Sequence, residues 1–199
     1  MKRTTLLRAA DYPSTPWKNG GGTSHEITRD AGQALDDFGW RLSMVDVEKG
    51  GAFSAFTGYQ RIITVLQGAG MALEIDGQPS RALPVSDPMA FSGDSEVICH
   101  LSDGPVRDFN LIYDAQCYDA RLQWLDVRQP QRVFSSASTL LVFSVAQQMA
   151  VSIDEGLWEI LGHYDCLRTD NPGGLLEIEL QAPSASRCCL IELSARGEP

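Results

Sequence analysis

Hydrophobic and polar residues alternate along most of this chain in short runs with a period of two. Residues 71–75 read Met-Ala-Leu-Glu-Ile and are followed at once by Asp76 and Gly77. Alternation of this kind is typical of a strand with one buried face, and Asp-Gly between two such runs predicts a tight β-hairpin. Similar β-rich runs, bounded by Gly, Pro, Asp or Ser, occupy residues 61–67, 97–101, 108–113, 140–145, 175–180 and 188–193.

Helical periodicity is weak throughout the sequence. We expect a short linking turn at residues 114–121 and a single helical turn at residues 155–160, because neither segment carries a sustained apolar stripe. Many short strands with regular turn signals are typical of a sandwich or a jelly roll. The pattern therefore predicts an all-β fold, and 199 residues suit one compact domain or two small fused ones.

Residues 62–93 resemble the core of the cupin fold. A β-rich run ends at Gly68-Ala-Gly70, the Asp76-Gly77 turn follows, and the stretch closes with Phe91-Ser-Gly93. In cupins, a glycine turn of this kind joins two strands of the jelly roll, and a later glycine elbow starts the closing strands. The resemblance implies a jelly-roll β-barrel in this part of the chain.

Four sequence blocks resemble the HutD/Ves family, in the order expected for that family. They are residues 17–27 (WKNGGGTSHEI), 38–43 (FGWRLS), 51–61 (GAFSAFTGYQR) and 104–111 (GPVRDFNL). The match covers about residues 13–113, and beyond them it consists of length and β character. The resemblance implies a double cupin (bicupin), with an N-terminal cupin and its ligand pocket at residues 1–113 and a smaller C-terminal cupin at residues 114–199.

The family resemblance also implies a function. HutD proteins are encoded with histidine-utilisation enzymes and are regarded as small-molecule binders that temper histidine breakdown, with N-formimino-glutamate or urocanate as suggested ligands. We therefore expect a binding protein that modulates histidine utilisation rather than an enzyme, and we assign no catalytic residue. Two alternatives stay open: a metal-free cupin isomerase or lyase that uses Glu26 or Asp108 as a general base, and an interaction module whose outer sheet face binds a partner.

The histidines argue against a cupin metal site. A metallocupin presents two histidines at alternate positions of one strand, where one metal ion takes both. Here the corresponding residues 60–64 read Gln-Arg-Ile-Ile-Thr, and the three histidines of the chain, His25, His100 and His163, are far apart in sequence. We expect neither a metal nor another cofactor.

Strand parity predicts a polar pocket. Arg41 and Ser43 share one face of a strand at residues 40–47, and Arg61 leads the apolar face of the next strand. Asp108 and Asn110 share a face of the strand at residues 108–113. Polar groups that lead otherwise apolar faces are typical of the mouth of a barrel cavity.

Arginine suits the capture of a carboxylate, since its planar guanidinium donates two parallel hydrogen bonds. We hypothesise that Arg41 and Arg61 hold a ligand carboxylate, with Ser43 on the same face. The other end of the ligand would be fixed by Asn19, Glu26, Asp108 and Asn110. The alternative is structural: Arg41–Asp108 or Arg61–Glu26 would be ion pairs at the rim.

Charge and cysteine content limit the partners and the compartment. Sixteen Lys and Arg against 26 Asp and Glu give a formal net charge of −10, which disfavours nucleic acid. No apolar stretch is long enough to span a membrane or to act as a signal peptide, and five scattered cysteines indicate reduced thiols. We expect a cytoplasmic protein whose partner is a small anionic metabolite, with an open edge strand that favours a homodimer.

Overall fold

The computed structural model describes residues 2–17, 20–32 and 37–197. The chain forms two compact units: residues 13–116, here the N-terminal unit, and residues 1–12 together with 117–199, here the C-terminal unit. From the sequence, we expected residues 1–12 to belong to the N-terminal domain. In the structure, β1 (Arg3–Leu7) pairs instead with β17 (Cys166–Asp170), because Leu6 of β1 packs against the C-terminal core.

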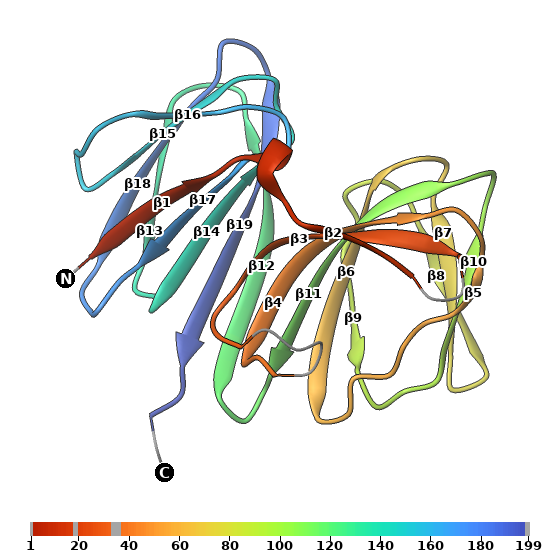
Figure 1. Ribbon diagram of the computed structural model, residues 1–199. Coiled ribbons are helices and arrows are strands. Elements are labelled where there is room, and N and C mark those ends of the chain that lie inside the picture. Colours follow the sequence, from red (N-terminus) through yellow and green to blue (C-terminus); the bar gives the residue numbers. More distant parts are fainter. Residues whose placement is uncertain (1, 18–19, 33–36, 198–199) are drawn as a thin grey trace. The chain divides into compact units, whose positions relative to one another are not determined.

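Two antiparallel sheets make up the N-terminal unit (Figure 1). The strand order of the first is β2-β3-β4-β11-β6-β9, with bounds Ser14–Pro16, Gly22–Arg29, Trp40–Val47, Val106–Asp114, Tyr59–Gln67 and Met89–Ser92. The order of the second is β5-β10-β7-β8, with bounds Gly51–Ala52, Val97–Leu101, Met71–Ile75 and Gln78–Leu83.

The C-terminal unit has the same construction. Its first sheet has the order β1-β17-β14-β19-β12, where β14, β19 and β12 span Thr139–Ser144, Ser186–Ala195 and Tyr118–Val127. Its second sheet has the order β13-β18-β15-β16, with bounds Gln131–Ser135, Leu176–Gln181, Met149–Ile153 and Glu159–Leu161. Within the described residues, the helical part of the chain is a single 3-10 turn, η1 (Ala9–Asp11).

The predicted strands are confirmed, and two of them, β7 and β10, have the predicted bounds. The Asp-Gly hairpin is also confirmed: Ile75 pairs with Gln78, and Asp76 and Gly77 both have positive φ, as a type I′ turn requires. Two expectations were wrong in part. Residues 115–117 form the expected linking turn, but residues 118–121 belong to β12, which pairs with β19 along its whole length. Residues 159 and 160, the end of the expected helical turn, belong to strand β16.

The core of the N-terminal unit lies between its two sheets. Val45 and Ile63 of the first sheet belong to one buried cluster with Leu73 and Cys99 of the second. The hydrogen-bonded ladders of the described residues nevertheless stay in two sheets per unit. The all-β jelly-roll prediction is therefore confirmed, with facing sheets in place of the closed barrels that we expected.

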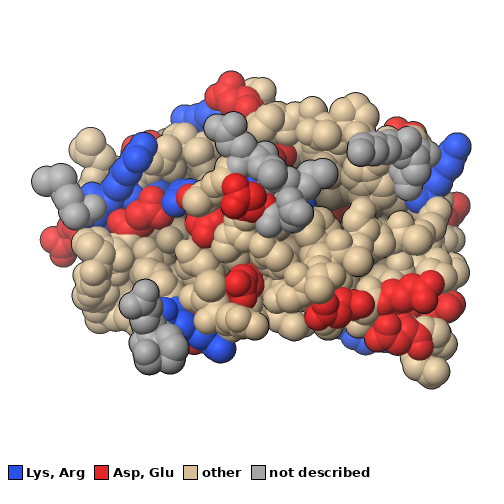
Figure 2. All heavy atoms as spheres, turned by 60° about the horizontal axis from the view of Figure 1, so that its bottom comes forward, with Lys and Arg blue, Asp and Glu red and all other residues tan. Residues whose placement is uncertain are grey.

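The surface and the thiols complete the description. Figure 2 shows one face on which acidic side chains gather in several patches, while basic ones are more scattered. Four of the five cysteines are buried free thiols, and the fifth, Cys117, is exposed. Within the described ranges, we find no helix with the length and apolar character needed to cross a membrane.

Candidate functional site

The inner face of the N-terminal unit carries the predicted polar residues. Ile112 of β11 lies opposite Arg41 of β4 on one side and Arg61 of β6 on the other. Asn110 likewise lies opposite Ser43 and Ile63. Because directly paired residues project from the same face of a sheet, these side chains point toward the second sheet, as their core neighbour Ile63 does. The predicted strand parity is confirmed.

These polar groups are deeply buried. Ser43, Arg61, Asp108 and Asn110 keep only 4%, 5%, 1% and 6% of their surface exposed, and Arg41 is half-buried. Burying a charged or polar side chain costs free energy unless a partner compensates it. The hydrogen-bond and charge partners of each group therefore decide whether its burial is compensated.

Arg61 makes few hydrogen bonds for a buried cation. Its Nη1 donates to the carbonyl oxygen of Ser54 at 3.2 Å, and its Nε finds no hydrogen-bond partner among the described residues. Instead, the guanidinium carbon lies 5.0 Å, 5.3 Å and 5.4 Å from the ring centres of Phe91, Phe53 and Phe56. Burial lowers the pKa of Arg61 to about 10, with Asp108 opposing this shift and Arg41 adding to it. Arg61 is thus a cation at neutral pH.

Arg41 shares this aromatic environment. Its guanidinium carbon lies 4.8 Å from the ring centre of Phe38 and 5.3 Å from that of Phe56. Burial lowers the pKa of Arg41, and Glu26 opposes this shift. One ring, Phe56, therefore lies between two guanidinium groups, and a cation over an aromatic face is stabilised electrostatically. We call Arg41, Arg61 and the four rings Phe38, Phe53, Phe56 and Phe91 the guanidinium–aromatic cluster.

Glu26 meets a different arginine from the one we considered. Its Oε1 accepts a hydrogen bond from Nε of Arg29 at 2.7 Å, and Arg29 Nη2 also contacts Oε2. A bulge between Glu26 and Thr28 shifts the register, so that Arg29 lies opposite Arg41. Simple alternation puts Arg29 on the outer face, and for that reason the sequence analysis missed it. The structural alternative Arg61–Glu26 is replaced by Glu26–Arg29.

Asp108 is the most deeply buried acid of this face. Its Oδ1 has no hydrogen-bond partner among the described residues, and the same holds for Oδ1 of Asn110. Burial raises the pKa of Asp108 to about 7; Arg61 lowers it and Asp46 raises it further. The buried face thus offers two acceptor oxygens beside a buried cation. Asn19, the remaining predicted ligand residue, lies outside the described residues.

A metal ion does not fit this face. Guanidinium groups carry positive charge and no acceptor, so Arg41 and Arg61 would repel a cation rather than ligate it. The three histidines lie apart, each beside another group: His25 against Asp46, His100 at 3.6 Å from Glu74, and His163 against the carbonyl of Val145.

The outer face of the same sheet holds a row of polar residues that sequence reasoning missed. Ser14 Oγ lies 2.7 Å from His25 Nδ1, and His25 Nε2 lies 2.9 Å from Asp46 Oδ2. In serine hydrolases it is Nε2 that faces the serine, whereas here it is Nδ1. Both carboxylate oxygens of Asp46 also accept from Arg107, at 2.6 Å and 2.9 Å. We interpret the row as a link between β2, β3, β4 and β11.

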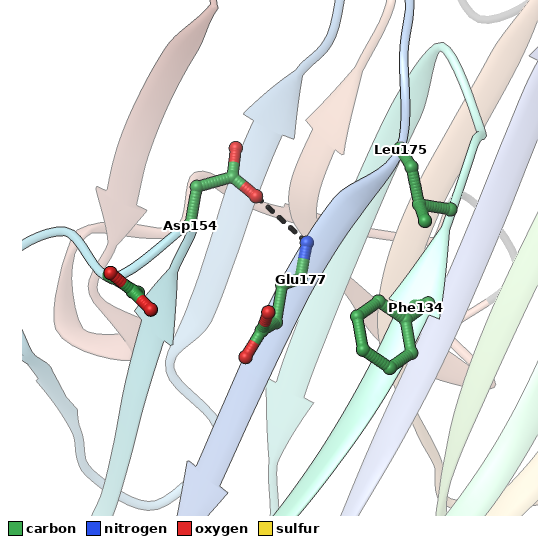
Figure 3. A pocket seen from close by; sticks show the side chains of 5 residues that line it. Phe134, Asp154, Leu175 and Glu177 are labelled. Atoms are coloured by element: carbon green, nitrogen blue, oxygen red, sulfur yellow. Dashed lines mark hydrogen bonds between the residues drawn. The ribbon is translucent and has the colours of Figure 1, made fainter.

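Two open cavities lie away from the guanidinium–aromatic cluster. One, of about 570 Å³, is lined in the N-terminal unit by residues that include Asp46, Gln67 and Arg107. The other, of about 300 Å³, lies in the C-terminal unit (Figure 3), where Phe134 and Leu175 are neighbours and Asp154 accepts a hydrogen bond from the backbone N–H of Glu177.

The fold and the inner polar face define a class of protein: a double cupin whose N-terminal unit carries a buried arginine, Arg61, and a half-buried one, Arg41, on its inner face. Solved structures that share only 7% to 11% of their residues with this chain have TM-scores of 0.66 to 0.72 against it. At such low identity they show the fold alone.

The chain belongs to the HutD family, whose family model matches residues 9–190. A Pseudomonas putida protein described as an uncharacterized 21.2 kDa protein in the hutC 3′ region is 56% identical, over 98% of this chain and 100% of that protein. The solved structure of HutD from Pseudomonas fluorescens is 54% identical and covers 98% of this chain and 100% of its own, with a TM-score of 0.87. Protein Ves of Escherichia fergusonii is 30% identical over 74% of this chain and 71% of its own.

These matches confirm the predicted family. They also support the coarser part of the functional expectation, a HutD-type protein linked to histidine utilisation.

Proposed function

We propose that this protein binds a small anionic intermediate of histidine degradation, N-formimino-glutamate or urocanate, without a metal, and thereby modulates histidine utilisation. The observation that carries the proposal is Arg61, a buried cation whose Nε has no hydrogen-bond partner among the described residues. A buried cation with an unsatisfied N–H group is costly, and a carboxylate offers the matching bidentate acceptor.

The neighbouring groups favour a ligand that carries a carboxylate and hydrogen-bond donors. Arg41 and Arg61 hold the carboxylate in this proposal. Ser43 and Asn110 lie on the same inner face, and Glu26, beside Arg41, takes an N–H group at the other end of the ligand. N-formimino-glutamate has two carboxylates and an amidine-like tail; urocanate has one carboxylate and an imidazole.

Access to Arg61 needs a movement of the chain. Phe53 and Phe56 cover the guanidinium group, and both lie between β5 and β6, in residues 53–58. We propose that this segment opens to admit the ligand and that its rings then close over the ligand.

Isothermal titration calorimetry of metal-free protein with each of the two compounds tests the proposal. We expect saturable binding that Arg61→Ala weakens by more than about 1.4 kcal/mol, a tenfold change in Kd. Arg132→Ala is the matched control, because Arg132 belongs to the C-terminal unit and pairs there with Glu177 and Glu179. Absence of heat with both compounds, or equal losses in the two variants, would contradict the proposal.

A second candidate function is a metal-free isomerase or lyase. The observation that favours it is Asp108, whose raised pKa of about 7 suits a general base at neutral pH. Incubating the protein with the same two compounds and following their NMR spectra separates the two functions. Turnover that Asp108→Asn abolishes would favour the enzyme; unchanged spectra beside saturable binding would favour the binding protein.

A further inference from the structure

Asp108 is a buried acid in a setting that favours its neutral form. It keeps 1% of its surface, and its Oδ1 has no hydrogen-bond partner among the described residues. Its position on β11 is between Val45 of β4 and Val65 of β6, both of them core residues. An ionised carboxylate in such a place has almost no contact with solvent and one oxygen without a hydrogen bond, so the neutral acid is favoured.

The charged and titratable groups around Asp108 come from three elements. Arg61 of β6 is the nearby cation and stabilises the ionised form. Asp46 of β4 is a nearby anion and opposes it; Arg107 and His25 hydrogen-bond to Asp46, and they keep its pKa low. Cys99 of β10 also lies close, but burial raises the pKa of its thiol to about 12. Arg61 is thus the nearby group that favours the ionised form of Asp108 and limits the rise of its pKa.

An anion bound at Arg61 removes this support. The ligand carboxylate pairs with the guanidinium and places a second negative charge near Asp108, and like charges disfavour each other's ionised forms. We propose that each anion bound at Arg61 brings one proton with it, which is held on the carboxyl group of Asp108. This inference rests on the proposed function and assigns Asp108 to the carboxylate end of the ligand.

The coupling has a definite sign. The pKa of Asp108 in the free protein is about 7. Below pH 7, Asp108 is therefore already neutral before the ligand binds, and the affinity does not change with pH. Above pH 7, the free protein must first take up a proton, so affinity falls by up to tenfold per pH unit. Between pH 6 and pH 8, the Kd for N-formimino-glutamate should rise about tenfold.

Calorimetry of N-formimino-glutamate binding at pH 8, in phosphate and in Tris, tests the coupling. These two buffers differ in their heats of ionisation, so the difference in binding heat counts the protons exchanged. We expect uptake of nearly one proton by the native protein and by His25→Gln, whose histidine lies on the outer face. Asp108→Asn should exchange no proton on binding, and its Kd, whatever its size, should be constant from pH 6 to pH 8.

The failures are distinguishable. Absence of binding at every pH overturns the proposed function, and this inference with it. Binding with a constant Kd and no proton exchange overturns the coupling alone. Proton release on binding also overturns it, because release means that Asp108 meets the cationic end of the ligand. Loss of the proton uptake in His25→Gln would move the coupling from Asp108 to the histidine.

Discussion

Two buried aspartates, one in each unit, show how differently the same fold treats a negative charge. Asp165 of the C-terminal unit accepts hydrogen bonds from Arg8 Nη1 and from the backbone N–H groups of Ala9 and Gly162, at 2.7 Å, 2.8 Å and 2.8 Å. Burial alone would raise the pKa of Asp165, but these bonds hold it below its ordinary value. Asp108 of the N-terminal unit has no such set of donors, and its pKa rises to about 7.

The interiors of the two units differ in the same way. The C-terminal core is built of apolar side chains such as Val142, Met149 and Ile178. The inner face of the N-terminal unit carries Arg61 and Asp108 among its valines. The buried acid of the C-terminal unit, Asp165, thus stabilises the fold through its hydrogen bonds. In the N-terminal unit, the buried Arg61 and Asp108 each keep an atom without a hydrogen bond among the described residues. This difference is the reason why we propose the N-terminal unit, rather than the C-terminal unit, as the one that binds the ligand.

The largest expected effect is a change in the pH dependence of stability in Asp108→Asn. The pKa of Asp108 is raised from an unfolded value of about 3.9 to about 7, so the folded state holds the proton more tightly. Stability therefore falls as pH rises between these values, by a total on the order of 4 kcal/mol, and the loss is complete above pH 7. Urea unfolding at pH 5 and pH 8 should show this fall in the native protein and a smaller one in the variant. An equal fall in both proteins would show that Asp108 does not cause it, and the contrast between the raised pKa of Asp108 and the lowered pKa of Asp165 would be contradicted.

Asp165→Asn should destabilise the protein by about 2 kcal/mol at pH 7. The substitution removes the charge that Arg8 pairs with and places an amide beside buried N–H donors. The matched control is Asp126→Asn, which breaks an exposed pair with Arg187 and should have little effect on stability. Urea unfolding measures both. Similar small losses would show that the donors around Asp165 are not structural.

Phe56→Leu should weaken anion binding about tenfold and have little effect on the stability of the fold. The ring contacts the guanidinium groups of both Arg41 and Arg61, and such contacts in buried sites contribute about 1–2 kcal/mol. Phe134→Leu removes an exposed ring from the C-terminal unit and should leave the Kd unchanged. Titration calorimetry compares the two variants, and an effect of Phe134→Leu as large as that of Phe56→Leu would speak against a site confined to the N-terminal unit.

The smallest effect is expected on the outer face. His25→Gln breaks the contacts with Ser14 and Asp46, both partly exposed, and should cost about 0.5 kcal/mol of stability. The Kd for the anion should stay within twofold of the native value. A large loss of affinity would show that the polar row on the outer face, which includes His25, takes part in binding.

The sequence predicted the strands and the inner polar face because both follow from a period of two. Arg41, Ser43, Arg61, Asp108 and Asn110 fall on one face by alternation alone, and the registers of β4, β11 and β6 agree. What alternation could not predict was the bulge in β3 that turns Arg29 toward Arg41 and gives Glu26 its partner. Whether a strand carries a bulge depends on how it pairs with its neighbour in the sheet, and the local sequence of one strand does not show this pairing.

Other features were hidden because they depend on distant pairing. β1 joins β17 across more than 150 residues. Residues 118–121, where local sequence indicated a turn, begin β12, which pairs with β19 along its whole length. Likewise, no local pattern shows whether a buried aspartate will meet donors. Asp165 and Asp108 both lie in β-rich surroundings, and only the folded chain brings Arg8 and Ala9 to one of them.

The most direct test of the central claim is a crystal structure of the protein with N-formimino-glutamate, soaked at a concentration set by the calorimetric Kd. We predict a ligand carboxylate within about 3 Å of the guanidinium nitrogens of Arg61, with Phe53 and Phe56 closed over it. Density for the compound in the C-terminal cavity of Figure 3, with Arg61 still bonded only to the carbonyl of Ser54, would contradict the account.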